Sequence, residues 1–183
     1  LFPYTTLFRS DPMHIKEEAV ERHTLAVIVD NEPGILARIA GLFTARGYNI
    51  SSLTVSEISD DDLISRITIV TEASAPVMEQ IIAQLERLVP VHKVTDLTAF
   101  GPHVERELAL VKVAGTGEHR IEALRLAEVY RARVVDATTS SFVFEVTGGS
   151  EKLDKFVELM RDLGLVEVAR TGIVAIARGA EAA

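Results

Sequence analysis

Apolar residues along this chain follow two different spacings, and the spacings alternate in a regular order. Stretches that are nearly continuous in β-branched residues, such as His23–Asp30, are typical of buried strands. Other stretches place apolar residues three and four positions apart, as one face of an amphipathic helix requires. From His23 onward the patterns predict the order strand, helix, strand, strand, helix, strand. After the breaker pair Gly101-Pro102 the same order returns, although the residues themselves do not repeat.

The expected elements have local start and stop signals. In the first half Pro33 suits a first helical turn, Gly47 closes that helix, and Ser74 is a candidate N-cap for the next one. The predicted strands of this half are His23–Asp30, Tyr48–Ser56, Leu63–Thr71 and Val91–Leu97, with one helix that has Pro33 in its first turn and ends at Gly47 and another over Ala75–Leu88. In the second half the predicted strands are Glu107–Ala114, Arg133–Thr139, Phe142–Thr147, Leu165–Ala169 and Ile173–Ala177, with helices over Glu118–Tyr130 and from a Ser150 cap to Gly164.

Two units of this order in series predict an α+β protein with two tandem ferredoxin-like (βαββαβ) domains. We expect the first domain at residues 22–98, a linker at 99–103, the second domain at 104–179 and a tail at 180–183. Residues 1–12 show neither periodicity, so we interpret them as a non-native or disordered leader, with Met13 as the natural start.

Composition and charge exclude several classes of function. Of the 183 residues, 48% are hydrophobic, which is enough for two modest cores. The net charge is −8 and the basic residues are scattered, so we expect no nucleic-acid partner. No apolar run approaches the ~20 residues that cross a bilayer, so we expect no membrane span. The chain has no cysteine, which excludes disulfides and thiolate catalysis and fits a reducing compartment, and we expect the cytoplasm.

Motifs for catalysis or metal binding are missing from the sequence. None of the five histidines lies four residues from another, as a helical metal site would require. Gly115-Thr116-Gly117 follows a predicted strand, but Arg120 stands where the dinucleotide fingerprint needs glycine. Ser140 and Ser141 lie in a predicted hairpin turn without the context of a nucleophile elbow. We therefore predict no catalytic residue, no metal site and no enzyme activity on this chain.

The turn between the first predicted strand and helix has the chemistry of a small-ligand site. Free N–H groups at a helix start suit a carboxylate, and Gly34 lets a ligand approach the backbone. The side-chain oxygens of Asn31 and Asn49 could accept from an ammonium group. The apolar wall would comprise Ile35, Leu36, Ile50 and Val55. These features together describe a branched-chain amino acid, but ordinary helix-start and turn chemistry explains the same residues equally well.

The residues of this turn, Asp30–Leu36 (DNEPGIL), resemble an ACT domain, the amino-acid-sensing module. Further blocks resemble the small regulatory subunit of acetolactate synthase (acetohydroxyacid synthase). These blocks are Gly41–Phe43 (GLF), Arg46–Ile50 (RGYNI), Ser52–Val55 (SLTV), His103–Leu108 (HVEREL), Val111–Val113 (VKV) and Val166–Gly172 (VEVARTG). The resemblance runs from about His23 to Gly179, nearly the whole chain, and the order and spacing of the blocks make it specific.

The resemblance implies a non-catalytic subunit without a cofactor of its own. Its partner would be the large catalytic subunit, which carries thiamine diphosphate, Mg²⁺ and usually FAD and condenses two pyruvates to acetolactate. The small subunit would stimulate that enzyme and confer feedback inhibition by valine, sometimes by leucine or isoleucine. By the same resemblance the ligand lies between the ACT domains of a homodimer. The matching positions are Asn31, Gly34, Ile35 and Leu36 of one chain with Asn49, Ile50 and Val55 of the other.

The residue at position 35 is often smaller in the family, so Ile35 leaves the preferred amino acid open. In a ferredoxin-like sheet the predicted strand Tyr48–Ser56 lies at an edge, and a homodimer would pair that edge. Tyr48 and Ile50 alternate in one phase, Leu53 and Val55 in the other, which predicts a bulge near Ser51-Ser52.

Two further functions compete with this prediction. The chain could be a free-standing ACT-type amino-acid sensor that acts on another protein, although such a sensor would not need the HVEREL block and the second domain. The second domain could instead respond to a metal ion, and the absence of a histidine cluster argues against that.

Overall fold

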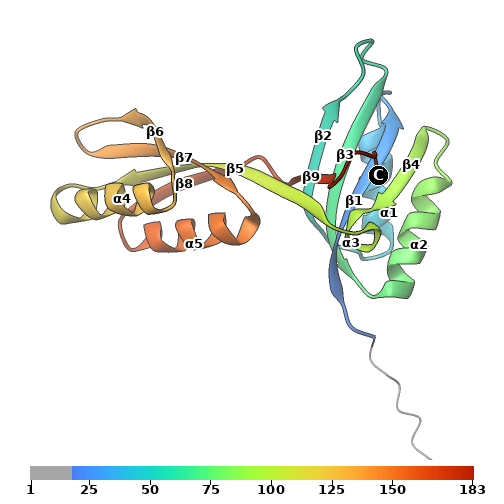
Figure 1. The fold of residues 1–183 in the computed structure, drawn as a ribbon, viewed down its shortest axis with the longest axis horizontal. Coiled ribbons are helices and arrows are strands. Elements are labelled where there is room, and N and C mark those ends of the chain that lie inside the picture. The colour runs from blue at the N-terminus through green and yellow to red at the C-terminus, as the bar shows by residue number, and fades with distance from the viewer. Residues whose placement is uncertain (1–17) are drawn as a thin grey trace, which may run out of the picture.

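The computed structural model describes residues 18–183 and shows two lobes connected by a long strand (Figure 1). Each lobe is an antiparallel sheet with helices on one face. The leader expected at residues 1–12 lies outside the described residues. Within residues 18–183, no helix combines the length and the apolar composition that a membrane span needs.

The first lobe has the predicted βαββαβ order followed by one short helix. Its elements are β1 (Glu21–Asp30), α1 (Ile35–Ala45), β2 (Ile50–Glu57), β3 (Ile64–Ala73), α2 (Ala75–Glu86), β4 (Val91–Asp96) and α3 (Leu97–Phe100). The strands are ordered β2-β3-β1-β4. Fully buried side chains of α1, α2 and the sheet form one core, among them Leu25, Ile39, Phe43, Ile67, Ile81 and Leu85.

The second lobe repeats the order with one strand added at the end. Its elements are β5 (His103–Ala114), α4 (Gly117–Val129), β6 (Arg133–Ala137), β7 (Ser141–Gly148), α5 (Ser150–Arg161), β8 (Leu165–Arg170) and β9 (Val174–Ala177). The strands of its main sheet are ordered β6-β7-β5-β8. The prediction of an α+β fold with two βαββαβ units is therefore confirmed.

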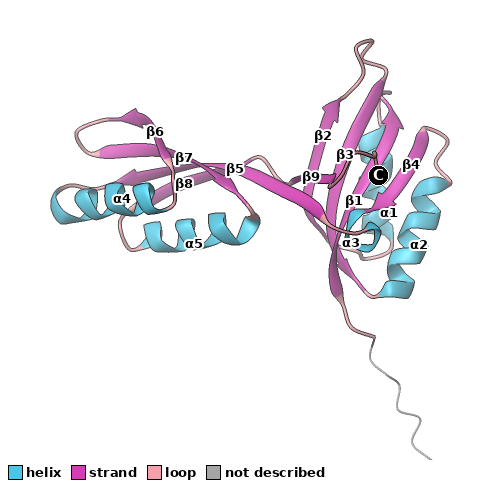
Figure 2. Cartoon of the chain, in the orientation of Figure 1, coloured by secondary structure: helices cyan, strands magenta, loops and turns pink. Residues whose placement is uncertain are grey.

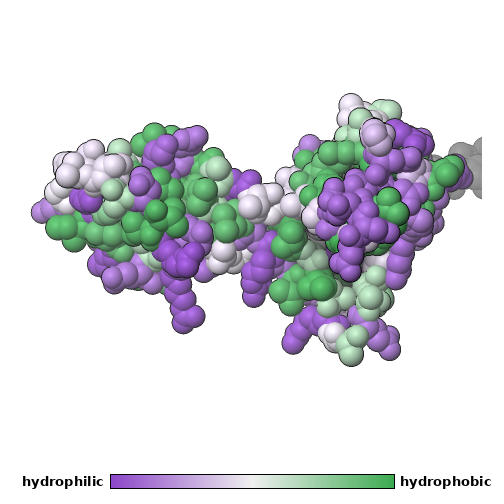
Figure 3. Space-filling view, turned by 90° about the horizontal axis from the view of Figure 1, so that it is seen from above, coloured by the Kyte–Doolittle hydropathy of each residue, from purple (hydrophilic) through white to green (hydrophobic). Residues whose placement is uncertain are grey.

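One face of the second sheet is covered by helices and the other is not. Alternate residues of β5 and β7, such as Val111 and Phe144, are buried because α4 and α5 lie along that face (Figure 2). On the uncovered face Leu110 is 40% exposed. The view from above shows apolar side chains gathered over this lobe, interrupted by hydrophilic ones (Figure 3).

The segment expected to be a linker, residues 99–103, contains the end of α3 and the first residue of β5. The chain turns at Gly101 (φ 144°) and at once continues as a strand, because His103–Arg106 pair with Val174–Ala177 of β9. These two strand segments lie across the first sheet on the face opposite α1 and α2, where the short helix α3 also packs, so the chain ends beside the first lobe (Figure 1). Buried Leu97 and Ala175 pack there against Ala26. The two lobes are thus held together by a hairpin-like pair of strands.

Helix ends differ from the predictions by one or two residues. Helix α1 begins at Ile35, and its N-cap is Gly34 in a left-handed conformation (φ 85°), so Pro33 precedes the helix instead of standing in its first turn. Helix α5 has Gly149 as its N-cap, and Ser150 is its first residue. The predicted stop at Gly47 is confirmed: this residue has φ 70° and follows the C-cap Arg46, as a left-handed glycine closing a helix does.

Candidate functional site

Strand β2 is one of the two edge strands of the first sheet, the other being β4, and β2 is bulged. The strand order places β2 at the end of the sheet, and its register with β3 shifts between Ile50 and Ser52. Both sequence-based predictions about this strand are therefore confirmed. In a regular strand, residues three positions apart point to opposite faces. Because of the bulge, Ile50 and Leu53 both pack against the core. Ser52 and Thr54 lie on the opposite face, which β9 crosses.

The seven residues expected to bind a ligand fall into two groups. Asn31, Gly34, Ile35 and Leu36 lie at one end of the first lobe, whereas Asn49 and Ile50 lie at the opposite end, with Val55 midway along β2. Ile50 lies opposite Thr71 of β3, and Thr71 lies opposite His23 near the start of β1. Asn31, in contrast, directly follows the last residue of β1. Eight residues of extended strand separate the level of Ile50 from Asn31, which corresponds to about 26 Å. A small ligand cannot touch both groups within one chain.

The first group lies around the start of α1. A Cβ atom added at Gly34 would meet no atom within 4 Å, so the space in front of this turn is open. Leu36 is 40% exposed and borders that space. Ile35 is only 7% exposed and belongs to the core, so its side chain is not presented as an apolar wall on the surface of this chain. In this first turn the backbone N–H groups lack intrahelical acceptors, as at every helix start.

The side chain of Asn31 is held by the turn between β2 and β3. Its Nδ2 donates to Oε1 of Glu57 (2.9 Å) and to the carbonyl oxygen of Asp62 (2.8 Å). The backbone N–H of Asn31 donates to the carbonyl of Leu63 (2.7 Å). Sequence reasoning treated the acidic turn only as a connection between strands, because its contact with Asn31 joins residues that are 26 and 31 positions apart.

The second group lies at the start and in the middle of β2. Asn49 is exposed, and its backbone carbonyl accepts a hydrogen bond from Oγ1 of Thr71 (2.5 Å). Val55 is 45% exposed, whereas Ile50 is half-buried. Other large apolar side chains are exposed around the β2–β3 turn, including Ile58 and Leu63. The free edge of β2 is therefore accompanied by uncovered apolar surface.

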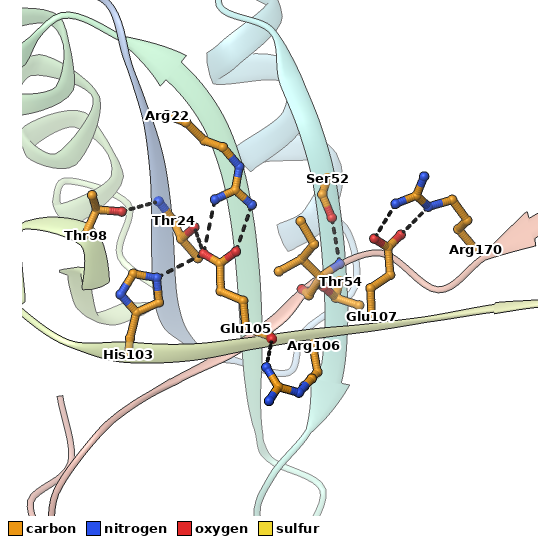
Figure 4. A network of polar contacts seen from close by, with 11 residues as sticks. Arg22, Thr24, Ser52, Thr54, Thr98, His103, Glu105, Arg106, Glu107 and Arg170 are labelled. Carbon is orange, nitrogen blue, oxygen red and sulfur yellow. Dashed lines mark hydrogen bonds and ion pairs between the residues drawn. The ribbon is translucent and has the colours of Figure 1, made fainter. Parts of the chain in front are cut away.

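A polar network joins the two lobes where β5 crosses β1 (Figure 4). Glu105 accepts hydrogen bonds from both terminal nitrogens of Arg22 (2.9 and 3.3 Å) and from Oγ1 of Thr24. Nε2 of His103 lies 3.0 Å from the same carboxylate. Burial alone would raise the pKa of Glu105, but the hydrogen bonds from Arg22, Thr24 and His103 outweigh it and lower the pKa to about 2.

The segment between β8 and β9 is attached to β2 through the backbone N–H and carbonyl groups of Ile173. The backbone N–H of Ile173 donates to Oγ of Ser52 (2.8 Å), and its carbonyl oxygen accepts from Oγ1 of Thr54. These two hydroxyl groups lie between Ile50 and Val55 in the sequence, so the contact with the second lobe falls within the second group of candidate residues. The sequence blocks at this contact are Ser52–Val55 (SLTV), which contains both hydroxyl groups, and Val166–Gly172 (VEVARTG), which directly precedes Ile173. Both contributed to the resemblance, but neither showed from the sequence that the two segments meet.

The cleft next to this contact has a volume of about 540 Å³ and receives residues from both lobes. Two arginines line it, and both are paired with carboxylates. Arg170 binds Glu107 through two hydrogen bonds of 2.8 Å, while Arg22 binds Glu105. Within residues 18–183, no three His, Asp and Glu side chains come together in a way that could hold a metal ion.

The comparisons with known proteins agree with this architecture. Residues 25–93 match the model of the "AHAS small subunit-like ACT domain", so the first lobe is an ACT domain. Residues 106–179 match the family model "Small subunit of acetolactate synthase". The chain therefore belongs to the family of acetolactate synthase small subunits.

Individual relatives cover nearly the whole length of both chains. A probable acetolactate synthase small subunit of Archaeoglobus fulgidus is 50% identical over 158 residues, which are 86% of this chain and 98% of the relative. The isozyme 3 small subunit of Escherichia coli is 46% identical and covers 86% of this chain and 96% of its own. The crystal structure of the small subunit from Thermotoga maritima has a TM-score of 0.78 at 37% identity and covers 88% of this chain and 99% of its own.

Proposed function

We propose that this chain is the non-catalytic regulatory subunit of acetolactate synthase. It stimulates the thiamine-diphosphate-dependent catalytic subunit and makes that enzyme sensitive to feedback by valine. The observation that carries the proposal is the match to acetolactate synthase small subunits over both lobes, which extends well beyond the ACT domain. Thiamine diphosphate, Mg²⁺ and FAD would belong to the large subunit, and the small subunit would act on them only through protein contacts.

A homodimer through β2 accounts for the separation of the two groups of candidate residues. An exposed strand edge has unpaired N–H and C=O groups, and a second copy related by a two-fold axis can satisfy them. If the axis passes between Leu53 and Thr54, Ile50 of one chain lies opposite Glu57 of the other. Glu57 is hydrogen-bonded to Asn31. The Asn31–Gly34 turn of one chain then comes beside Asn49 and Ile50 of its partner.

The ligand in this dimer would be a branched-chain amino acid. Its carboxylate would face the N-terminal turn of α1, where N–H groups and the helix dipole favour negative charge. Its ammonium group would meet the side-chain oxygens of Asn31 and of the partner's Asn49. Its aliphatic side chain would contact Leu36 and the partner's Ile50, and the Val55 nearest to it would be that of the chain that supplies Asn31, two positions from Glu57. Because Ile35 is buried in the core, it would act through the shape of the helix start rather than by direct contact.

Reconstitution with the catalytic subunit tests the regulatory role. Pyruvate turnover is measured with thiamine diphosphate, Mg²⁺ and FAD for this chain alone, for the catalytic subunit alone and for the mixture, each over a range of valine concentrations. We expect no turnover by this chain, a higher rate in the mixture and inhibition of the mixture by valine. Turnover by this chain alone would contradict its non-catalytic role. Valine binding without stimulation would instead favour a sensor that acts on another protein.

Sedimentation and thermal unfolding test the dimer and its ligand. A ligand that binds only the assembled native state raises its stability by mass action, by about 2.7 kcal/mol at a hundredfold excess over Kd. We expect valine to shift the monomer–dimer equilibrium toward the dimer and to raise the melting temperature. If valine, leucine and isoleucine all leave both measurements unchanged, the Asn31–Gly34 turn is a structural feature only.

A further inference from the structure

The carboxylate of Glu57 and the carbonyl group of Asp62 hold the side-chain amide of Asn31 in one orientation. Both acceptors are engaged by Nδ2, at 2.9 and 2.8 Å. An asparagine amide has two N–H donors on one side and an acceptor oxygen on the other. With both donors used, Oδ1 points away from the turn and can only accept a hydrogen bond.

The turn that supplies these acceptors is itself held in place. Oγ of Ser59 accepts hydrogen bonds from the backbone N–H groups of Leu63 (3.1 Å) and Ile64 (3.0 Å). Asp62 has a left-handed backbone (φ 56°), which sets the direction of its carbonyl group. A flipped Asn31 amide would place its oxygen against two oxygen atoms, so the flip is electrostatically opposed. The orientation is therefore imposed by the acidic turn.

We propose that Glu57 is the residue that makes the ligand site selective for an amino acid over the 2-oxo acid of the same carbon skeleton. This inference rests on the proposed function, in which Asn31 meets the ligand's amino group. An ammonium group brings donors to Oδ1 of Asn31, whereas the oxygen of a 2-oxo acid brings only lone pairs. The negative charge of Glu57 beside Asn31 attracts the ammonium group further. Asn31 is exposed in the single chain, and the ligand and the partner chain would cover its Oδ1 in the proposed dimer. Selectivity follows because an acceptor that is covered without receiving a donor is penalised.

Two substitutions separate the orientation of Asn31 from the charge of Glu57. In Glu57→Ala the side-chain amide of Asn31 loses one of its two acceptors. The amide can then turn so that an N–H group faces a ligand oxygen. In Glu57→Gln the amide oxygen still accepts from Nδ2, so the orientation is kept while the charge is removed. Glu57 is exposed at the end of an edge strand, so neither substitution disturbs the core. Glu167→Ala, in the second lobe where Glu167 pairs with Lys112, is the matched control.

The experiment is calorimetric titration of the purified chain and the three variants with valine and with 3-methyl-2-oxobutanoate. We expect the wild type to prefer valine at least a hundredfold. Glu57→Ala should weaken valine binding roughly tenfold and reduce the preference by more than that, while Glu57→Gln should recover most of the preference. Glu167→Ala should behave as the wild type.

Three results would overturn the inference, and they differ in whether the proposed ligand site survives. A preference that is unchanged in Glu57→Ala, with valine still bound by the wild type, would refute the role of Glu57 alone. Binding of neither compound by the wild type, with the dimer intact by sedimentation, would also remove the ligand site of the proposed function. Equal binding of both compounds by the wild type would refute the selectivity.

Discussion

The contact between the lobes makes a quantitative prediction for Glu105→Gln. This substitution removes the charge that Arg22, Thr24 and His103 share, and it leaves one carbonyl acceptor in nearly the same volume. The side chain of Glu105 is only 18% exposed, so solvent screens these interactions little. Because Arg22 lies on β1 and Glu105 on β5, the substitution weakens the attachment of the long strand to the first sheet.

The lowered pKa gives the size of the effect. The pKa of Glu105 falls from an ordinary value of 4.5 to about 2 in the folded chain, and this difference corresponds to about 3 kcal/mol at neutral pH. A carboxyl group whose pKa is lowered on folding stabilises the folded state above the unfolded pKa. That contribution is lost as the pH falls from about 4.5 through about 2. Since glutamine keeps one hydrogen bond, we expect a loss of about 2–3 kcal/mol at pH 7.

Urea unfolding followed by far-UV circular dichroism measures this loss for the wild type and Glu105→Gln at pH 7, 5 and 3.5. The difference between the two proteins should be nearly constant from pH 7 to 5 and clearly smaller at pH 3.5. Glu167→Gln is the control, because its ion pair with Lys112 is exposed (66% and 44%) and should contribute less than about 1 kcal/mol. If Glu105→Gln costs no more than this control, or if its cost does not depend on pH, the reasoning from the lowered pKa is wrong.

Three further predictions concern the candidate site and its connection to the second lobe. Gly34→Asp should abolish inhibition by valine in the reconstituted enzyme while stimulation remains, because its carboxylate competes with that of the ligand. The control Gly34→Asn places a side chain at the same left-handed position (φ 85°) without the charge, and it should retain more inhibition. Ser52→Ala combined with Thr54→Val should increase hydrogen exchange at the amide of Ile173 at least tenfold, whereas unchanged exchange would show that these hydroxyls do not hold the segment. Val55→Asp places a charge on the exposed edge strand and should shift the chain to monomers in sedimentation, which a persistent dimer would contradict.

The sequence by itself determined the order of the elements and the class of the fold. Strand and helix periodicities are local properties, so each segment could be assigned without knowledge of its neighbours in space. The change of phase between Ile50 and Leu53 even predicted the bulge in β2. The start of α1 was predicted less well, since Pro33 is compatible with a first turn and only the left-handed Gly34 shows that the helix begins at Ile35. For the candidate site, the sequence proposed the residue types and the resemblance proposed the positions, and both remain predictions.

Only the tertiary structure decided how distant segments meet. The pairing of His103–Arg106 with Val174–Ala177 joins strands about 70 residues apart, and it turned an expected linker into the contact between the lobes. The position of Glu105 against Arg22 and the orientation of the Asn31 amide likewise depend on partners 83 and 26 residues away. No local pattern encodes such contacts. The spacing of apolar residues in a segment shows which face of the element each side chain occupies, but not which residue of another element lies opposite it. For the same reason only the register of β1, β2 and β3 showed that Asn31 and Ile50 lie at opposite ends of the lobe.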